Sequence, residues 1–382
     1  MPPRGFARRV GRGIVPLMAV RLKDIAQELG LSVVTISKAL RHHPDIAEQT
    51  RERILRRVQE LGYQPNLTAR SLVTGKSYLI GLVVPGLLHP FFAEVARSLS
   101  SVIGREGYSL LLASSEEDFA LEQREVEQML ARRLDALVIA TTSNRRESYE
   151  RLAESGVPLV LIDRAIPGLA AHFVGVDDEA VGRMATEHLL AQGARRIAHI
   201  RGRENSVGEG RFAGYRKALE SAGHSYSSSL VVARNNVDVD SVELGAEAMR
   251  ILLTRKPRPD AVFAYNDPLA IGAMDAILEA GLRIPEDIAV IGCGNLYYNR
   301  SLRVPLSSID QRSYQIGERT AEILLKAMAK KPAGRSAKVV LEPELVVRAS
   351  TLRKSATPPT KAKPTHSTPS SSKRAIPGKA SS

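Results

Sequence analysis

The sequence predicts a small all-α domain at the N-terminal end, followed by a larger α/β core built on parallel sheets. Residues 22–61 place apolar side chains at helical spacing around a glycine turn. Between about residues 78 and 350, short apolar runs alternate with amphipathic stretches of helix length. The runs lack polar alternation, which is typical of parallel strands covered by helices on both faces. Because this part is too long for one six-stranded sheet, we expect two lobes, although the strand count alone also suits a closed (β/α)8 barrel.

Charge and composition limit the classes of partner. The chain has 382 residues, a net charge of +13 and a single cysteine. One cysteine excludes an internal disulfide and a cysteine-based zinc site, and no run of 18 apolar residues indicates a membrane helix. Residues 1–76 carry 14 basic and 6 acidic side chains, residues 354–382 carry 6 basic and none acidic, and the remainder is close to neutral. The sequence therefore predicts a polyanion partner for the two ends, no cofactor and no membrane partner.

Both ends of the chain are expected to be disordered basic segments, over residues 1–19 and 354–382. They consist mainly of small, polar and basic residues, which bury too little apolar surface to offset the entropy lost on ordering. A secretory signal is not expected, because the apolar patch at 14–20 is short and contains Pro16. Met18 remains an alternative to Met1 as the first translated residue.

Residues 22–40 predict a helix-turn-helix. Ile25 and Ala26 line one face of a first short helix, and the small Ala26 lets a second helix cross closely. Gly30 then permits a turn that other residues resist, and Ser32 is placed to cap the next helix. That second helix, Val33–Leu40, is the one that enters the major groove in such motifs.

A third helix is expected at residues 47–61, which completes a DNA-binding domain over residues 20–64. Pro65 stops this helix, and Asn66 can cap a short further helix in a hinge and linker at 65–77. The short helix has little apolar face, so it is marginal alone.

The core elements are predicted from apolar runs and the stretches between them. Seven runs predict strands at residues 78–85, 108–114, 134–141, 158–163, 196–200, 261–265 and 288–292. Amphipathic stretches predict helices between these strands, for example at 119–132, 180–192 and 267–281.

These segments resemble the LacI/GalR family of transcriptional regulators. The resemblance rests on LKDIAQELGLSVVTISKAL, TRERILRRVQELGYQPNLTARSLVTGKS and IGLVVP, and in the core on RFAGY, AYNDPLAIGAM and LSSIDQ. It covers roughly residues 20–353. It implies a type I periplasmic-binding-protein-like core at 78–353, with two α/β lobes joined by three crossovers and an effector cleft between them. We place the first lobe at about 78–175 plus 306–340, and the second at 176–305.

The resemblance implies a set of DNA contacts in the second helix and the hinge. Val33 and Val34 are expected to contact thymine methyl groups, and Lys38 to reach guanine or a phosphate, although most relatives have arginine at that position. Leu72 matches a leucine wedge that kinks the duplex from the minor groove. The predicted DNA-binding residues are Ser32, Val33, Val34, Thr35, Ser37, Lys38, Asn66, Ala69, Arg70 and Leu72.

The resemblance also implies a site for a small-molecule effector, either a sugar or another small polar metabolite. Arg211 and Asp267 match cleft positions of the family, and strand ends supply further candidates. Gly294 and Asn295 stand where relatives usually have two aspartates, so no carboxylate is expected there to hold a sugar hydroxyl. The predicted effector-binding residues are His89, Phe91, Asp163, Arg164, Val207, Arg211, Asp267 and Asn295.

The sequence thus predicts a dimeric, cytoplasmic and nucleoid-associated repressor that binds a pseudo-palindromic DNA operator under effector control. The sequence is less compatible with two other classes of protein. An enzyme is disfavoured because no Gly-x-Ser-x-Gly, His-Glu-x-x-His or Walker loop occurs. A periplasmic-type solute-binding protein without a DNA-binding role would share the core, but it would require export and would not explain residues 22–72. Activation of transcription instead of repression stays open at this stage.

Overall fold

The structure is a computed structural model that describes residues 20–40, 42–63, 71, 74–329 and 336–353. Within it the described residues form two compact units. The first contains those up to residue 78 together with 132–135, and the second contains the other described residues. The predicted fold class is confirmed: an all-α headpiece and a two-lobed α/β core are both present.

The headpiece consists of three helices, α1 (Leu22–Leu29), α2 (Val33–Leu40) and α3 (Glu48–Glu60). Gly30 ends α1 with a left-handed φ of 68°, the conformation for which a glycine is best suited. The hydroxyl of Ser32 accepts a hydrogen bond of 3.0 Å from the backbone N–H of Thr35, which caps α2 as expected. A small apolar core holds the helices together, and its buried members are Ile25, Ala26, Ile36, Ala39 and Ile54.

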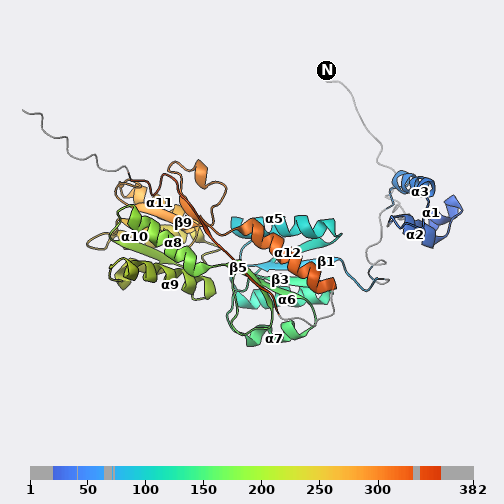
Figure 1. Ribbon diagram of the computed structural model, residues 1–382, viewed down its shortest axis with the longest axis horizontal. Coiled ribbons are helices and arrows are strands. Elements are labelled where there is room, and N and C mark those ends of the chain that lie inside the picture. Colours follow the sequence, from blue (N-terminus) through green and yellow to red (C-terminus); the bar gives the residue numbers. More distant parts are fainter. Residues whose placement is uncertain (1–19, 41, 64–70, 72–73, 330–335, 354–382) are drawn as a thin grey trace, which may run out of the picture. The chain divides into compact units, whose positions relative to one another are not determined.

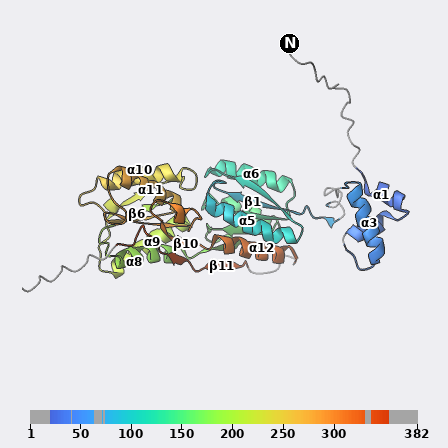
Figure 2. The same ribbon diagram turned by 90° about the horizontal axis from the view of Figure 1, so that it is seen from above.

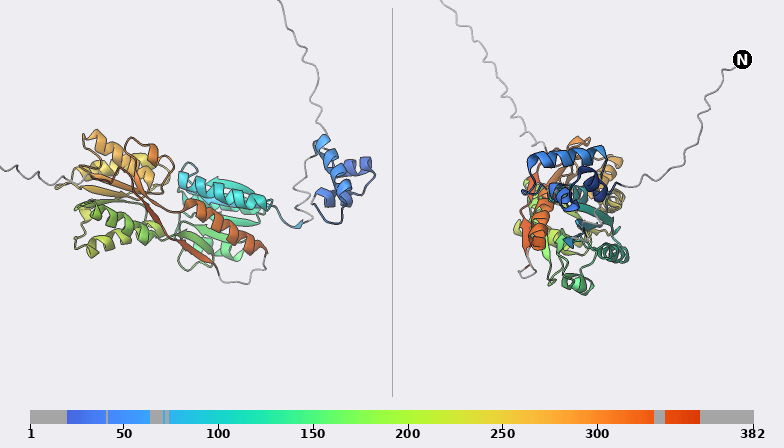
Figure 3. Two further views of the ribbon diagram at one scale, coloured as in Figure 1. Left: turned by 45° about the horizontal axis from the view of Figure 1, so that its top comes forward. Right: turned by 90° about the vertical axis from the view of Figure 1, so that its right-hand side faces the viewer.

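The first lobe is a six-stranded parallel sheet with helices on both faces. Its strand order is β11-β5-β4-β3-β1-β2, and α5 and α12 lie side by side against one face (Figure 1, Figure 3). The strands are β1 (Leu79–Val84), β2 (Ser109–Ser114), β3 (Ala136–Ile139), β4 (Leu159–Ile162), β5 (His172–Val176) and β11 (Lys338–Leu341). The helices are α5 (Pro90–Arg105), α6 (Phe119–Ala131), α7 (Glu147–Glu154) and α12 (Ser313–Ala329).

The second lobe repeats this architecture with the order β12-β10-β9-β8-β6-β7, in which only the β10–β12 pair is antiparallel among the described strands. Helices α10 and α11 pack together on one face and α8 and α9 on the other (Figure 2). The strands are β6 (Ile197–Arg201), β7 (Val231–Ala233), β8 (Ala261–Ala264), β9 (Ala289–Cys293), β10 (Ser307–Asp310) and β12 (Glu344–Val346). The helices are α8 (Asp178–Ala191), α9 (Ser206–Ser221), α10 (Ser241–Leu253) and α11 (Asp267–Glu279), with 3-10 turns at Ser228–Leu230 and Asn299–Ser301.

The chain passes between the lobes after β5, after β10 and after β11, which gives three connections. One expected lobe boundary is wrong. The sequence predicts 306–340 as part of the first lobe, but β10 at the start of this range pairs with β9 and therefore belongs to the second sheet. The reason is that β10 continues the series of strands of the second lobe. The chain returns to the first lobe only after β10, at the turn before α12.

All seven apolar runs predicted to be strands form strands. The strands β5, β7, β10, β11 and β12 were not predicted. They have three to five residues each, and β7, β11 and β12 lie at sheet edges, where exposed positions interrupt the apolar pattern. Within the described ranges, no helix is long and apolar enough to cross a membrane.

Candidate functional site

The start of α2 presents apolar side chains to the outside of the headpiece. Val33 is 42% exposed and Val34 is 63% exposed, whereas Ile36 and Ala39 on the opposite face are fully buried. Core packing therefore does not explain the two valines. A pair of exposed branched side chains at the first turn of a helix can instead make apolar contacts with thymine methyl groups.

The polar side chains of α2 are arranged around these valines. The hydroxyls of Ser32 and Thr35 lie 2.8 Å apart in a hydrogen bond, and Ser37 is half-buried. The ammonium of Lys38 donates to Asp45 at 2.8 Å. This bond lowers the pKa of Asp45, and the carboxylate competes with DNA for the ammonium of Lys38.

Arginines of α3 hold the headpiece together through backbone carbonyls, a role that the sequence did not predict. Arg51 donates to the carbonyl of Ile46 at 2.9 Å, and Arg53 donates to the carbonyl of Leu29 at 2.9 Å. Arg57 pairs with Glu28 of α1 and with Glu60. Part of the positive charge of the headpiece is thus engaged in hydrogen bonds and ion pairs within the headpiece.

The four predicted hinge contacts, Asn66, Ala69, Arg70 and Leu72, lie outside the described residues. Their roles therefore stay expectations based on the resemblance.

A group of buried charges joins the two lobes, which we call the inter-lobe cluster: Glu117, Asp163, Arg164, Asp238 and His89. The guanidinium of Arg164 is 1% exposed. It donates to Glu117 at 3.0 Å, pairs with Asp238, and lies 3.7 Å from the carboxylate of Asp163. Glu117 and Asp163 come from the first lobe and Asp238 from the second, so a single guanidinium connects carboxylates of both lobes.

His89 completes the cluster at the N-terminal end of α5. Its Nε2 atom lies 3.7 Å from Asp238 and 3.3 Å from the amide nitrogen of Asn266. Asn266 also caps α11, because its side-chain oxygen accepts from the backbone N–H of Leu269 at 2.9 Å. A further contact between the lobes is made where the backbone N–H of Ala165 donates to the hydroxyl of Ser206 at 2.9 Å.

Burial shifts the protonation of this cluster toward neutral forms. It raises the pKa of Glu117 to about 7, with the nearby charge of Asp238 adding to the effect. Burial also raises the pKa of Asp163 and lowers the pKa of His89. The cluster contains three carboxyl groups and one guanidinium, and a proton shared near neutral pH is one way to offset the difference.

Arg211, the predicted cleft arginine, is fully buried and engaged by protein groups. Its guanidinium donates to Asp178 at 3.0 Å, to the backbone carbonyl of Tyr265 and to the side chain of Gln311. The guanidinium also lies 4.5 Å from the centroid of the Tyr265 ring. Helix α8 can approach this arginine because of Gly182, where an added Cβ atom would overlap the carbonyl of Arg211.

Asp267 is held entirely by the second lobe. It accepts from the backbone N–H of Leu296 at 3.0 Å, from the amide of Asn299 at 2.7 Å and from the hydroxyl of Ser308 at 2.7 Å. Three donors on one fully buried carboxylate indicate a structural anchor. Burial nevertheless raises its pKa.

Two further predicted effector residues lie in apolar cores. Val207 is fully buried in the second lobe's core, beside Ile200 and Val237. Phe91 is packed in the first lobe's core, with its ring centroid 5.0 Å from that of Phe92. The structure gives both side chains a packing role.

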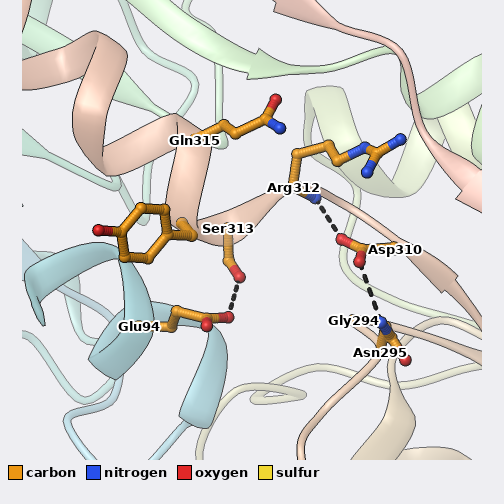
Figure 4. Close-up of a pocket in the computed structure, with 8 residues that line it drawn as sticks. Glu94, Gly294, Asn295, Asp310, Arg312, Ser313 and Gln315 are labelled. Carbon is orange, nitrogen blue, oxygen red and sulfur yellow. Dashed lines mark hydrogen bonds between the residues drawn. The ribbon is translucent and has the colours of Figure 1, made fainter. Parts of the chain in front are cut away.

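Asn295 lines a separate polar pocket between the lobes with a volume of about 240 Å³ (Figure 4). Its amide donates to Asp310 at 3.0 Å, and its oxygen accepts from Arg348 at 2.6 Å. On the other side of the pocket Ser313 points to Glu94 and donates a hydrogen bond to it. The lining residues are Glu94, Gly294, Asn295, Asp310, Arg312, Ser313, Tyr314 and Gln315.

The structure thus brings His89, Asp163 and Arg164 together and places Arg211, Asp267 and Asn295 in other networks. Sequence reasoning missed Glu117, Asp238 and Asn266. The signal for Glu117 was available, since it follows the strand at 109–114 just as His89 follows the strand at 79–84. Asp238 follows the three-residue strand β7, which the apolar pattern did not reveal.

The residues that the structure describes contain no candidate site for a metal ion or for a reactive thiol. No group of three or more His, Cys, Asp or Glu side chains among them could hold a metal ion. Cys293 is buried at the end of β9, and burial raises the pKa of its thiol, which favours a packing role as a small apolar side chain over a reactive one.

Two family models match the chain. Residues 21–66 match the model of bacterial regulatory proteins of the lacI family, and residues 186–351 match a periplasmic binding protein-like domain.

Individual relatives agree with these models. The chain is 32% identical over 335 residues to the HTH-type transcriptional repressor PurR of Haemophilus influenzae (strain PittEE), which covers 86% of this chain and 98% of that one. The solved complex of the transcriptional regulator CelR with cellobiose is 29% identical, with a TM-score of 0.65 over 87% of this chain and 99% of that one. The lac repressor dimer bound to operator and the anti-inducer ONPF is 26% identical, with a TM-score of 0.75 over 87% and 99%.

Proposed function

The chain belongs to the LacI family of bacterial regulatory proteins, and from this premise we propose that it represses transcription by binding an operator through the exposed start of α2. The observation that carries the proposal is the exposure of Val33 and Val34, at 42% and 63%, on a helix whose other face is buried. A solvated apolar pair at this place has no packing function, and it suits the apolar face of a thymine-containing base step.

The polar residues of α2 take positioning roles. Thr35 and Ser37 are placed for phosphate contacts, which orient the helix but do not select a sequence. Lys38 reaches a guanine or a phosphate after releasing Asp45, so its contribution to affinity is reduced by the energy of that 2.8 Å pair.

The protein acts as a homodimer on a pseudo-palindromic site, with the hinge residues Asn66, Ala69, Arg70 and Leu72 in the minor groove between the half-sites. This rests on the family resemblance and on the relative whose dimer was solved on its operator. Two copies of α2 related by a two-fold axis read two half-sites, so the operator has to be symmetric. The protein works in the cytoplasm, at the nucleoid.

A small polar effector bound between the lobes controls operator affinity. The cluster of Glu117, Arg164 and Asp238 connects the lobes with buried charges, so a ligand that inserts there changes how the lobes close. The relative that was solved with cellobiose supports a sugar-sized effector. An export-dependent solute-binding protein is not favoured, because residues 21–66 match a DNA-binding family model.

Selection of bound sequences from random duplex DNA tests the proposal. We expect the full chain to enrich a sequence with two-fold symmetry. The variant Val34→Ala, folded to the same extent by circular dichroism, should enrich a site altered at the base pairs that its α2 contacts. Enrichment of no sequence by the natural chain, at low ionic strength, would contradict the proposal.

A further inference from the structure

We propose that the effector of the inter-lobe cluster carries a protonated amino group, and that this group is bound by the carboxylate of Glu117 in the first lobe and Asp238 in the second. The proposal rests on the proposed function, because it specifies the ligand of the same cleft. It follows from the charge balance of the cluster and from the buried polar atoms that have no protein partner.

The charge balance comes first. Glu117, Asp163 and Asp238 all lie within ion-pair distance of one guanidinium, that of Arg164. All four side chains are at most 8% exposed. The other buried guanidinium nearby, Arg211, is paired with Asp178. Buried charges require a partner because water no longer solvates them, so the excess of carboxyl groups over Arg164 has to take up either a proton or a second cation, and a bound ammonium group can replace the proton.

The charge of half-buried Arg203 acts on Glu117 only at longer range. Its guanidinium donates to the backbone carbonyl of Glu117 at 3.4 Å and not to the carboxylate. The carboxylate of Glu117 thus depends on Arg164, which it shares with Asp238.

Orphaned polar atoms provide the second, independent observation. Among the described residues, the Oε2 atom of Glu117 and the Nδ1 atom of His89 are buried without a hydrogen-bond partner. The Nε atom of Arg164 and the hydroxyl of Thr142 share this state. Buried polar groups in native proteins are nearly always satisfied. Glu117 and Arg164 are hydrogen-bonded to each other and each keeps an unpaired polar atom, so these two atoms together point to a bound molecule. The carboxylate oxygen requires a donor, and the N–H of Arg164 requires an acceptor.

The kind of cation follows from the ligand geometry. No set of His, Cys, Asp and Glu side chains in the described ranges is arranged to hold a metal ion. The carboxylates come from separate loops on both lobes, which suits an ammonium group with several N–H donors pointing in different directions. An acceptor for Arg164 on the same molecule means an amino alcohol or amino sugar. A carboxylate-bearing molecule would add negative charge to a site that already has an excess.

Two series of matched ligands test the proposal on the full-length chain. The first is D-glucosamine, D-glucose and D-glucuronate, and the second is 4-amino-1-butanol, 1,4-butanediol and 4-hydroxybutanoate. Within each series the members share a scaffold and differ in charge. Binding is measured by calorimetry at pH 7 and equal ionic strength. We expect the amine to bind at least tenfold tighter than its neutral partner in at least one series, and the anion to bind most weakly.

Two variants locate the effect. Glu117→Gln keeps the shape of the side chain and removes its charge, so the preference for the amine should fall at least tenfold while neutral binding changes little. Glu116→Gln is the matched control, because Glu116 is the exposed neighbour and lies outside the cluster. If Glu117→Gln does not fold, the comparison of the three charges on the natural chain still decides the question.

The proposal is overturned if neither amine binds more tightly than its neutral partner, which includes the case in which no amine binds. It is also overturned if Glu117→Gln retains the full amine preference. Operator binding is measured on the same preparation with and without each ligand. Loss of operator binding under every condition would contradict the proposed function, whereas a tight operator complex without amine preference would contradict only this inference.

Discussion

In most proteins apolar side chains are buried and charged side chains are exposed. The start of α2 and the inter-lobe cluster depart from this distribution in opposite ways. Helix α2 exposes branched apolar side chains, Val33 and Val34, although its neighbours Ile36 and Ala39 are fully buried. The inter-lobe cluster buries charges, with Arg164 and Glu117 almost without solvent contact. Both arrangements cost free energy in the isolated chain, and both become favourable when a partner covers the valines or neutralises the carboxylates.

The comparison teaches where each partner acts. An exposed apolar pair on a basic headpiece needs no rearrangement of the protein to meet a duplex. A buried ionic cluster between two lobes admits a ligand only when the lobes separate, so binding there is coupled to their motion. The first region is therefore suited to recognition and the second to control.

The largest effect should come from removing the shared cation of the cluster. Arg164→Met leaves Glu117 and Asp238 buried without their guanidinium, which should lower the free energy of unfolding by about 3–5 kcal/mol. Urea denaturation followed by circular dichroism measures this. The control Arg319→Met breaks an exposed pair with Glu322 and should cost less than about 1 kcal/mol. Equal losses of unfolding free energy in both variants would show that the buried cluster contributes no more to stability than an exposed ion pair.

The next effect should come from reversing the chemistry of α2. Val34→Asp places a carboxylate at the DNA surface, which should weaken operator binding about 100-fold or more because the phosphates repel it. The control Val347→Asp changes a valine of the two-lobed α/β core that is also exposed, at 42%, and should leave operator affinity unchanged. Fluorescence anisotropy with a selected duplex measures both. A Val34→Asp chain that binds like the natural one would remove α2 from the interface.

A smaller loss is expected at the hinge. Leu72→Ala removes the predicted wedge, so specific binding should weaken about tenfold while non-specific binding stays the same, since only specific binding needs the kinked duplex. Gel shifts with the selected duplex and a scrambled duplex measure the specific and the non-specific affinity separately. A parallel fall in both affinities would contradict the wedge.

The smallest effect is the pH dependence of the cluster. The pKa of Glu117 is raised from 4.5 to about 7, so the folded chain holds a proton there that the unfolded chain has lost. This contribution to stability is present below pH 4.5 and disappears as the pH rises through 7. Between pH 5 and 8, Glu117→Gln should therefore gain stability relative to the natural chain, on the order of 1 kcal/mol. Denaturation curves across this range measure it, and a constant difference between the two chains would contradict the assignment.

The sequence predicts most of what local pattern determines. The apolar runs predict seven strands, and Gly30 with Ser32 predicts the turn and cap before α2. Ile36 and Ala39 lie on the buried face and the valines on the exposed one, because helical spacing alone separates these faces.

The inter-lobe cluster was predicted only in part, because it depends on long-range contacts. His89, Asp163 and Arg164 could be predicted from the sequence because they follow strands of the first lobe. Their partner Asp238 is 74 residues away from Arg164 and follows a strand too short to show a pattern. Arg211 matched a family position, yet its actual partners are Asp178 at the start of α8 and Gln311 in the turn between β10 and α12. Side-chain pairing across lobes is set by how the sheets face each other, which no local spacing specifies.

The ratio of affinities for the selected duplex and a scrambled duplex of equal length tests the central claim most directly. Anisotropy titrations with the full chain at physiological salt should give a preference of about 1,000-fold or more for the selected duplex. Both affinities should fall as salt is added, since phosphate contacts release counterions in either complex. Equal affinities for the two duplexes would contradict the claim that α2 reads a DNA sequence.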